Sequence, residues 1–559
     1  MAFNRNTPTK KKPRTPSEVV AEHEHTRVSG DLDQLIKMVD AILGQNEDFV
    51  ERRFNIFGKF PAVMFYFSDM VAHQDINMEI MKPLMYVPKH LADQPIEFAD
   101  LKDVLASNVL HYGQLSYECN IAALIESLMV GSTVIAIQDM GEAVVVSTRN
   151  IEKRSITQPQ TEQVIRGPRE GFIEQLSTNI GLMRYRLQTP DFRVKTLKVG
   201  RLTKSKVVVC YIDGIANPAL VDEVERRLSE IKIDGVLDVG YLEQFIEDNH
   251  FSPFPQVQNT ERPDKAVANL MEGRVIIMVD GSPFGLIVPS VFTQFYQTVE
   301  DYSERFLMVS FVRLARLVAL VFSLVFPALY VAVISFNPEL IPTEFAVAVA
   351  GGRAGVPWPS VIEVLIMEVT MEVLREATLR LPQQVGGALS IVGVLVVGQA
   401  AVSAGFTSPI TVVIIALTTI GSFATPAYNA ALALRLLRFP LIIMAGMFGL
   451  YGVMVGLIFI INHVLSLKSF GVPYMSPIVP GNFEGMKDTA ARWPLWSMFK
   501  RPAMLHTGQK QRVGDGTMKA VNDAPVNTLD PLKVGNDRRE IGDGESASDH
   551  DDSGGGHSD

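Results

Sequence analysis

The sequence predicts an α+β protein, in which a cytoplasmic domain of two duplicated α/β units is followed by a polytopic α-helical membrane domain. The first observation behind this prediction is internal similarity within the more polar half of the 559-residue chain. The second is a series of long charge-free runs in the part that follows. A helix needs about 20 mostly apolar residues to cross a bilayer core, and these runs supply them.

The α/β units are predicted from two pairs of similar segments. The segment that begins with AVMFYFSDMV at Ala62 is predicted to form a strand, then an Asp, then an amphipathic helix. The segment that begins with KVVVCYIDGI at Lys206 has the same order. GSTVIAIQDM at Gly131 is likewise echoed by GRVIIMVDGS at Gly273. Both pairs are offset by a little over 140 residues. A common offset for two separate matches favours duplication over coincidence.

The membrane domain is predicted to contain four clear spans. Residues 317–336 contain no charge and form the first. The charge-free run between Arg380 and Arg435 breaks at residues 404–409, where Gly and Pro mark a turn, so it predicts a helical hairpin of two spans. Residues 439–462 form the fourth span, with a Pro near its start, where a helix tolerates it.

Composition divides the chain into five parts. They are a basic, polar tail (1–45), a first cytoplasmic α/β subdomain (46–155), a linker with a second α/β subdomain (156–300), the membrane domain (301–468) and a C-terminal part (469–559). The C-terminal part begins with an interfacial segment, because Trp, Phe, Arg and Lys alternate after Ala491. It ends in an acidic Ser/Gly-rich tail that is predicted to be disordered.

The charge distribution predicts a multi-pass membrane protein whose N-terminal domain is cytoplasmic. The basic start of the chain is not followed by an apolar core, so we expect no secretion signal. Three arginines precede the first span, whereas two glutamates and one arginine follow it, in agreement with the positive-inside rule. These residues are Arg305, Arg313 and Arg316 before the span, and Glu339, Glu344 and Arg353 after it.

The sequence argues against an enzyme. It contains no P-loop, HExxH, GxSxG or CxxC pattern, so we expect no catalytic residue, no metal site and no cofactor. Cys119 and Cys210 lie far apart in the predicted cytoplasmic half, where a disulfide is not expected. The net charge of −10 comes partly from the acidic tail, and we expect no nucleic-acid partner.

The linker between the two α/β units holds a candidate subunit contact. Arg166 and Arg169 flank Gly167 and Pro168, which stiffen a turn and bring two guanidinium groups near each other. Arginine recognises carboxylates and phosphates well. The alternative is a surface linker whose arginines pair with local acids.

Six charges occur where the chain is most apolar, in the helix predicted over residues 361–381, and five of them lie between Leu365 and Pro382. At 3.6 residues per turn, four charged residues fall in one stripe of about 100°, while Glu363 lies on the opposite side. The four are Glu368, Glu372, Arg375 and Glu376. Arg380 follows Glu376 at a spacing of four, so these two side chains can pair along the helix.

Two interpretations of this helix compete. It either lies on the membrane surface with its acids in water, or it turns them toward a water-filled path as pore-lining or gating residues. If this helix crosses the membrane completely, the chain has five spans and its C-terminal tail lies outside. A cytoplasmic tail is favoured by four basic residues, Lys487, Arg492, Lys500 and Arg501. A helix that enters the membrane only partly is therefore a further possibility.

Several stretches together resemble one family. They are TEQVIRGPREGFIE, the segment from DYSERFLMVS to FNPELIP, the segment from LREATLRLPQQVGG to AGFTSP, and LRFPLIIMAGMFGLYG followed by SFGVPYMSP. In this order they look like the A subunit of spore germinant receptors, the GerA family. The resemblance covers roughly residues 46–480.

The resemblance implies a protein of the spore inner membrane that works with a transporter-like B subunit and a lipoprotein C subunit to sense nutrients. It also implies a homo-oligomer that forms a nutrient-gated cation channel and triggers germination. Nutrient binding is expected in the B subunit, so no ligand-binding residue is assigned to this chain. Two alternatives remain: a secondary transporter, and the A-like subunit of a second sporulation-specific germination channel.

Overall fold

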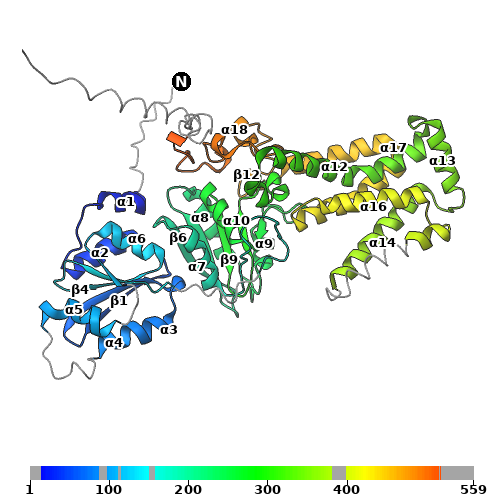
Figure 1. Ribbon diagram of the computed structural model, residues 1–559. Coiled ribbons are helices and arrows are strands. Elements are labelled where there is room, and N and C mark those ends of the chain that lie inside the picture. Colours follow the sequence, from blue (N-terminus) through cyan, green and yellow to red (C-terminus); the bar gives the residue numbers. More distant parts are fainter. Residues whose placement is uncertain are drawn as a thin grey trace, which may run out of the picture.

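The protein is an elongated molecule with three parts in a row. The computed structural model describes residues 14–86, 97–110, 115–149, 158–380, 398–514 and 516–517. Figure 1 shows a first α/β unit at one end, a second α/β unit in the middle and a long helical bundle at the other end. The mixed α/β character predicted for the N-terminal half is therefore confirmed.

The first unit is built on a five-stranded antiparallel sheet with the order β1-β2-β4-β5-β3. Its strands are β1 (Phe49–Ile56), β2 (Phe60–Phe67), β3 (Leu115–Glu118), β4 (Thr133–Ile137) and β5 (Ala143–Val146). One face of the sheet is covered by helices α1 (Pro16–Glu22), α2 (Leu32–Leu43) and α6 (Ile121–Val130). The other face is covered by α3 (His73–Asp75), α4 (Lys82–Met85) and α5 (Leu101–Val104).

Both faces of this sheet are buried, which explains the continuous apolar run of β2. Its side chains alternate between the two faces. Val63, Phe65 and Phe67 join the core beneath α2 and α6. Met64 and Tyr66 join the core on the opposite face.

The second unit repeats the arrangement, with the strand order β6-β7-β9-β10-β8. Its strands are β6 (Phe192–Val199), β7 (Ser205–Ile212), β8 (Gln258–Thr260), β9 (Val275–Val279) and β10 (Gly285–Val288), and its helices are α7 (Leu176–Arg186), α8 (Pro218–Glu230), α9 (Val239–Ile246) and α10 (Pro263–Glu272). The first pair of similar segments corresponds to β2 and β7, and the second pair to β4 and β9. Each pair occupies equivalent positions in the two sheets.

The helical bundle follows the short helix α11 (Glu300–Ser303). It contains α12 (Phe306–Phe336), α13 (Thr343–Arg353), α14 (Ser360–Arg380), α16 (Pro409–Phe423) and α17 (Tyr428–Ser466). Two of the described helices, α12 and α17, are long and apolar enough to cross a membrane. We call the end of the bundle beside the second α/β unit its near end, and the opposite end its far end (Figure 1).

The predicted hairpin between Arg380 and Arg435 is only partly within the described residues. Residues 381–397, most of its first arm, lie outside them. The predicted break is a turn in which Gly405 has φ +68°, and α16 begins directly after it. The second arm is shorter than the charge-free run, because α16 ends at Phe423 and a new helix begins at Tyr428, beyond Pro426.

The prediction of a single span over residues 439–462 is wrong. Helix α17 is interrupted at Gly449, whose φ of 61° and ψ of −142° are not helical. Beyond this residue the chain folds back, since a Cβ added to Gly452 would meet Met444 and one added to Gly456 would meet Leu441. Residues 428–448 and 450–466 therefore form an antiparallel helical hairpin.

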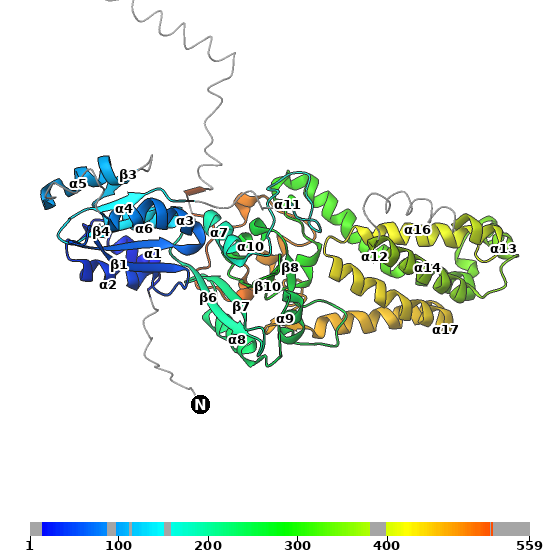
Figure 2. The ribbon, with the colours of Figure 1, turned by 90° about the horizontal axis from the view of Figure 1, so that it is seen from below.

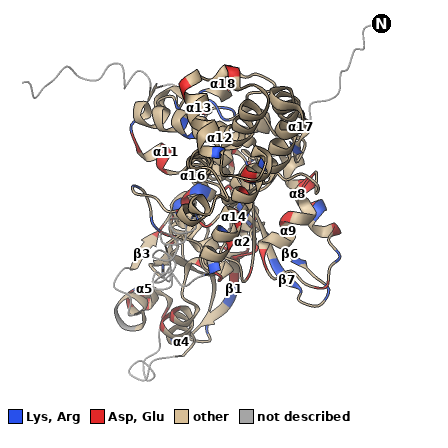
Figure 3. Ribbon diagram, turned by 90° about the vertical axis from the view of Figure 1, so that its right-hand side faces the viewer, with Lys and Arg blue, Asp and Glu red and all other residues tan. Residues whose placement is uncertain are grey.

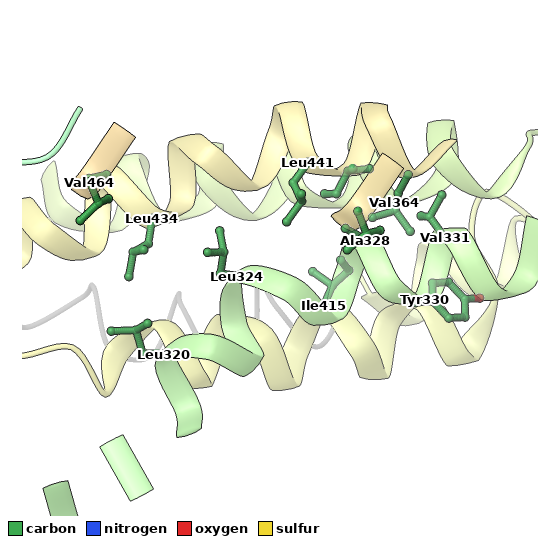
Figure 4. Packing of buried hydrophobic residues seen from close by; sticks show 14 of the residues in the cluster. Leu320, Leu324, Ala328, Tyr330, Val331, Val364, Ile415, Leu434, Leu441 and Val464 are labelled. Carbon is green, nitrogen blue, oxygen red and sulfur yellow. The ribbon is translucent and has the colours of Figure 1, made fainter. Parts of the chain in front are cut away.

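Contacts at both ends of the hairpin agree with this reversal. Gly449 lies against Phe336, the last residue of α12, at the far end. Both hairpin ends return to the second α/β unit, where the amide of Ala427 donates to Phe295 O (3.3 Å) and His463 contacts Ser252 (2.9 Å). Leu434 and Val464 belong to the same apolar cluster between the arms (Figure 4).

The chain after the bundle packs onto the second α/β unit (Figure 2). This part contains β11 (Lys468–Ser469), β12 (Val472–Pro473) and α18 (Phe483–Met486). Ser469 Oγ donates to Gln256 O (2.7 Å), and Arg501 Nε donates to Met271 O (2.8 Å). The chain thus enters and leaves the bundle at the same end.

Candidate functional site

Helix α14 carries six charged residues, whereas α16 carries none. Figure 3 views the molecule from the end of the bundle, with charged residues coloured on the ribbon. The helix begins at the far end, where the hydroxyls of Ser335 and Ser360 contact each other. Its sequence from Ser360 to Arg380 contains no Gly or Pro, and Pro382 follows its last turn. From the far end it runs toward the near end against α12, α16 and α17.

Glu363 is the first acid of α14 and is fully buried at the far end. Its Oε1 accepts hydrogen bonds from the amide of Ser408 (2.6 Å) and from Thr407 Oγ1 (3.1 Å). Its Oε2 accepts one from Arg353 Nε (3.2 Å). Glu363 therefore joins α13, α14 and the turn before α16.

Glu368 lies five residues further along and forms an ion pair inside the bundle. Arg438 lies on residues 428–448 of α17, the outgoing arm of the hairpin. Its Nη1 donates to both carboxylate oxygens of Glu368, at 3.0 and 2.8 Å. The two side chains are only 6% and 2% exposed. Arg438 Nε and Nη2 are buried and have no hydrogen-bond partner among the residues that the structure describes. The pair is the central polar contact between α14 and α17.

Glu372 lies between two arginines one turn nearer to the α/β side. Its Oε2 accepts a hydrogen bond from Arg375 Nη1 (3.0 Å), and its Oε1 is 3.8 Å from Arg435 Nε. The guanidinium of Arg375 also lies 5.1 Å from the ring centre of Phe423, at the end of α16. This acid is already 40% exposed.

Glu376 is the outermost acid of the helix. It pairs along α14 with Arg380 at 2.6 Å and is 59% exposed. The four acids from Glu363 to Glu376 thus change from complete burial to high exposure toward the near end.

The structure does not place the five predicted pore or gating residues in one environment. Glu363 and Glu368 are held inside the subunit, Glu372 and Arg375 lie at its margin, and Glu376 faces outward. Glu363 does have partners different from those of the other four, as its position on the opposite side of the helix predicts.

Sequence reasoning missed the partners of these acids. Arg435 served only as the end of a charge-free run and Arg438 was not considered, although two arginines spaced by three residues amid apolar sequence are themselves a signal. Residues three or four apart lie on one helix face, so the face of Arg435 and Arg438 can pair with the face of Glu368 and Glu372.

The predicted subunit-contact residues lie near the entrance to α12. Arg166 is largely exposed, and its Nη1 is 3.4 Å from Glu304. Arg169 is exposed on the same turn. Within the described ranges, no group of three or more His, Cys, Asp or Glu side chains is arranged to hold a metal ion.

Comparison with known proteins identifies the family. A family model described as the Bacillus/Clostridium GerA spore germination protein matches residues 37–504. The chain belongs to the GerA family. The resemblance found in the sequence is thereby confirmed.

Curated relatives agree with this assignment. The chain is 42% identical over 475 residues to spore germination protein KA of Bacillus subtilis, which covers 84% of this chain and 86% of the relative. It is 37% identical over 481 residues to spore germination protein GerLA of Bacillus cereus, covering 86% and 96%. It is also 38% identical to the B. subtilis uncharacterized membrane protein YfkQ, over 88% and 94%.

A solved structure is similar to the N-terminal half. It is the N-terminal domain of the A subunit of the Bacillus megaterium spore germinant receptor GerK3, 33% identical in sequence. The match covers 48% of this chain and 99% of that domain, with a TM-score of 0.37.

Proposed function

We propose that this GerA family chain is the A subunit of a spore nutrient germinant receptor, and that several copies assemble into a cation channel that opens on nutrient sensing. It would act in the spore inner membrane with a transporter-like B subunit and a lipoprotein C subunit. The observation that carries the channel proposal is the graded exposure of the acids on α14.

The gradient suits an ion path that begins at the near end. A charge at the centre of a bilayer costs about 2.5–3.5 kcal/mol on insertion scales unless it is paired or hydrated. Glu368 meets this requirement through Arg438. Glu372 and Glu376 are more exposed, and rings of such acids from several copies attract cations. We therefore assign the outer acids to cation entry and the Glu368–Arg438 pair to the closed gate.

The position of α14 supports contact with neighbouring copies. The helix diverges from the axis of the other bundle helices toward its near end (Figure 1). Val369 and Val373, on its outer side, are exposed apolar residues. With the α/β units in the cytoplasm, as the three arginines before the span favour, the near end is the cytoplasmic mouth of the path.

The test is single-channel recording of the purified oligomer in planar bilayers. Glu376→Gln is expected to lower the preference for cations over anions without changing assembly. Glu230→Gln is the matched control, because Glu230 forms a similarly exposed pair with Arg226 on α8, outside the bundle. Unchanged selectivity in Glu376→Gln and Glu372→Gln would contradict the pore assignment. Substrate flux without unitary currents would favour the transporter alternative.

A further inference from the structure

An apolar surface surrounds the point where the chain enters the bundle. On the first turns of α12, Leu307, Phe311 and Leu314 are exposed at spacings of four and three, so they form one helix face. Val318 and Val321 continue this face into the charge-free part of the helix. The apolar stripe therefore starts ten residues before the predicted span.

The C-terminal segment extends this surface sideways. Phe483 on α18 is 91% exposed, and Trp493, Leu495 and Trp496 are exposed as well. Trp496 packs edge-on against Phe306, with 6.1 Å between ring centres. The ammonium group of Lys487 lies 5.9 Å from the ring centre of Trp493. Exposed Trp beside Lys is the composition of a membrane–water interface.

Ion pairs fix this segment to α12 and remove the charges from the exposed face. Arg313 donates to Asp301 (2.8 Å) on one side and to Asp488 (2.7 Å) on the other, and it is almost completely buried. Arg492 Nη1 donates to Glu304 O (3.0 Å). Burial would raise the pKa of Asp301, but Arg313 and Arg316 hold that pKa below its usual range. Arg313 and Arg316 are thus turned inward, away from the stripe.

The three tryptophans of the chain lie at two levels along the bundle. Trp496 packs against Phe306, the first residue of α12, and Trp493 precedes Trp496 by three residues. Trp358 is at the far end, two residues before Ser360, whose hydroxyl contacts Ser335. From Phe306 to Ser335 an α-helix rises about 44 Å. A bilayer is about 40–45 Å thick when its headgroup regions are included.

We propose that residues 483–498, with the first two turns of α12, form a belt that binds the lipid headgroup region on the α/β side of the membrane. The agreement between the spacing of the two Trp levels and the bilayer thickness favours lipid over a second protein as the occupant of this surface. The belt also gives the C-terminal segment a role: it neutralises Arg313 and holds the entrance of α12 at the membrane surface.

The experiment uses the full-length protein in phosphatidylcholine nanodiscs. Trp358→Phe leaves only Trp493 and Trp496 as tryptophan emitters. Their fluorescence is expected to be quenched more by lipids brominated near the headgroup than by lipids brominated near the chain ends, and only weakly by aqueous acrylamide. The converse variant, Trp493→Phe/Trp496→Phe, leaves Trp358 as the remaining tryptophan. Its fluorescence is also expected to be quenched more by lipids brominated near the headgroup, here at the far end of the bundle.

A second probe removes the dependence on the native tryptophans. Phe483→Trp in a tryptophan-free variant changes a side chain that is almost fully exposed, so the fold is not disturbed. Quenching by headgroup-brominated lipid is expected again. Quenching of these sites by acrylamide alone would show that the surface faces water. Resistance to both quenchers would show that another protein chain covers it. Either result would overturn the proposal.

Discussion

Arg438 donates to both carboxylate oxygens of Glu368, so that α14 and the outgoing arm of α17 are joined by a buried ion pair. Removing one partner leaves an unpaired charge in the bundle, which typically costs about 3–5 kcal/mol. Glu368→Gln is therefore expected to lower the midpoint of thermal unfolding in detergent strongly.

The matched controls separate this loss from a general effect of substitution. The double variant Glu368→Met/Arg438→Met replaces the pair by apolar side chains and is expected to recover most of the lost stability. Glu376→Gln breaks an exposed pair and is expected to change stability by less than about 1 kcal/mol. If Glu368→Gln unfolds like the wild type, the pair does not hold the two helices together.

Gly449 allows the reversal of α17, and its replacement is expected to destabilise the hairpin. A residue with a Cβ is strained at φ 61° and ψ −142°, at a cost of about 1–3 kcal/mol. The added Cβ would also lie 3.0 Å from Phe336. Gly449→Ala is thus expected to lower the unfolding midpoint. Gly351→Ala in α13, where an added Cβ has open space, is expected to be neutral or slightly stabilising.

The hairpin itself can be measured by distances between spin labels at Leu432 and Leu465, both of which are exposed. In a straight helix these positions would be about 50 Å apart. In packed antiparallel arms, whose axes are about 8–10 Å apart, we expect a label distance below about 25 Å. Cys119 is exposed and would be replaced by Ser in this experiment, whereas Cys210 is buried. A single distance near 50 Å would contradict the fold-back.

The sequence pattern predicted the mixed fold of the N-terminal half because the apolar strands β2 and β7 are each followed by clear turn residues. The same approach failed at Gly449. Its neighbours Phe448 and Leu450 are apolar, and the turn lies in sequence that reads as one span, so no polar residue marks it. Hydropathy reports how apolar a segment is and does not report where it reverses.

The candidate site was only partly predictable for a different reason. The helical period of α14 identified its charged residues, but their partners come from distant sequence. Arg438 lies 70 residues after Glu368, and Ser408 lies 45 after Glu363. Helical periodicity determines which side of α14 each acid occupies. It contains no information on which other helix covers that side.

The two α/β units meet at a buried pair, beside a carboxyl group that should make stability depend on pH. Arg184 of α7 donates to both oxygens of Asp48 (2.5 and 2.7 Å) and lies over the ring of Phe67. Next to them, Asp69 Oδ2 is buried and has no hydrogen-bond partner within the described part of the chain. Burial, with a further contribution from Asp48, raises the pKa of Asp69 to about 7, against the opposing charges of Lys206 and Arg184.

The sign of the effect follows from this raised pKa. The folded protein holds the Asp69 proton more tightly than the unfolded chain, so this contribution to stability is complete below about pH 4 and is lost as the pH rises through 7. Asp69→Asn is expected to be more stable than the wild type above pH 7, on the order of 2–4 kcal/mol, with the difference vanishing near pH 4. Unfolding midpoints of both proteins across this range check the prediction, and a constant difference would contradict it.

Arg166 and Arg169 provide a test of assembly that does not depend on stability. Arg166 forms an exposed pair with Glu304, and exposed pairs contribute about 1 kcal/mol or less. The double variant Arg166→Ala/Arg169→Ala is therefore expected to unfold like the wild type but to yield less oligomer or receptor complex on native gels. Arg201→Ala is a matched control, because Arg201 forms a similarly exposed pair with Asp234 away from the linker. Full assembly of the double variant would show that these arginines serve only the local turn, whereas a loss confined to it would place the linker at a subunit contact.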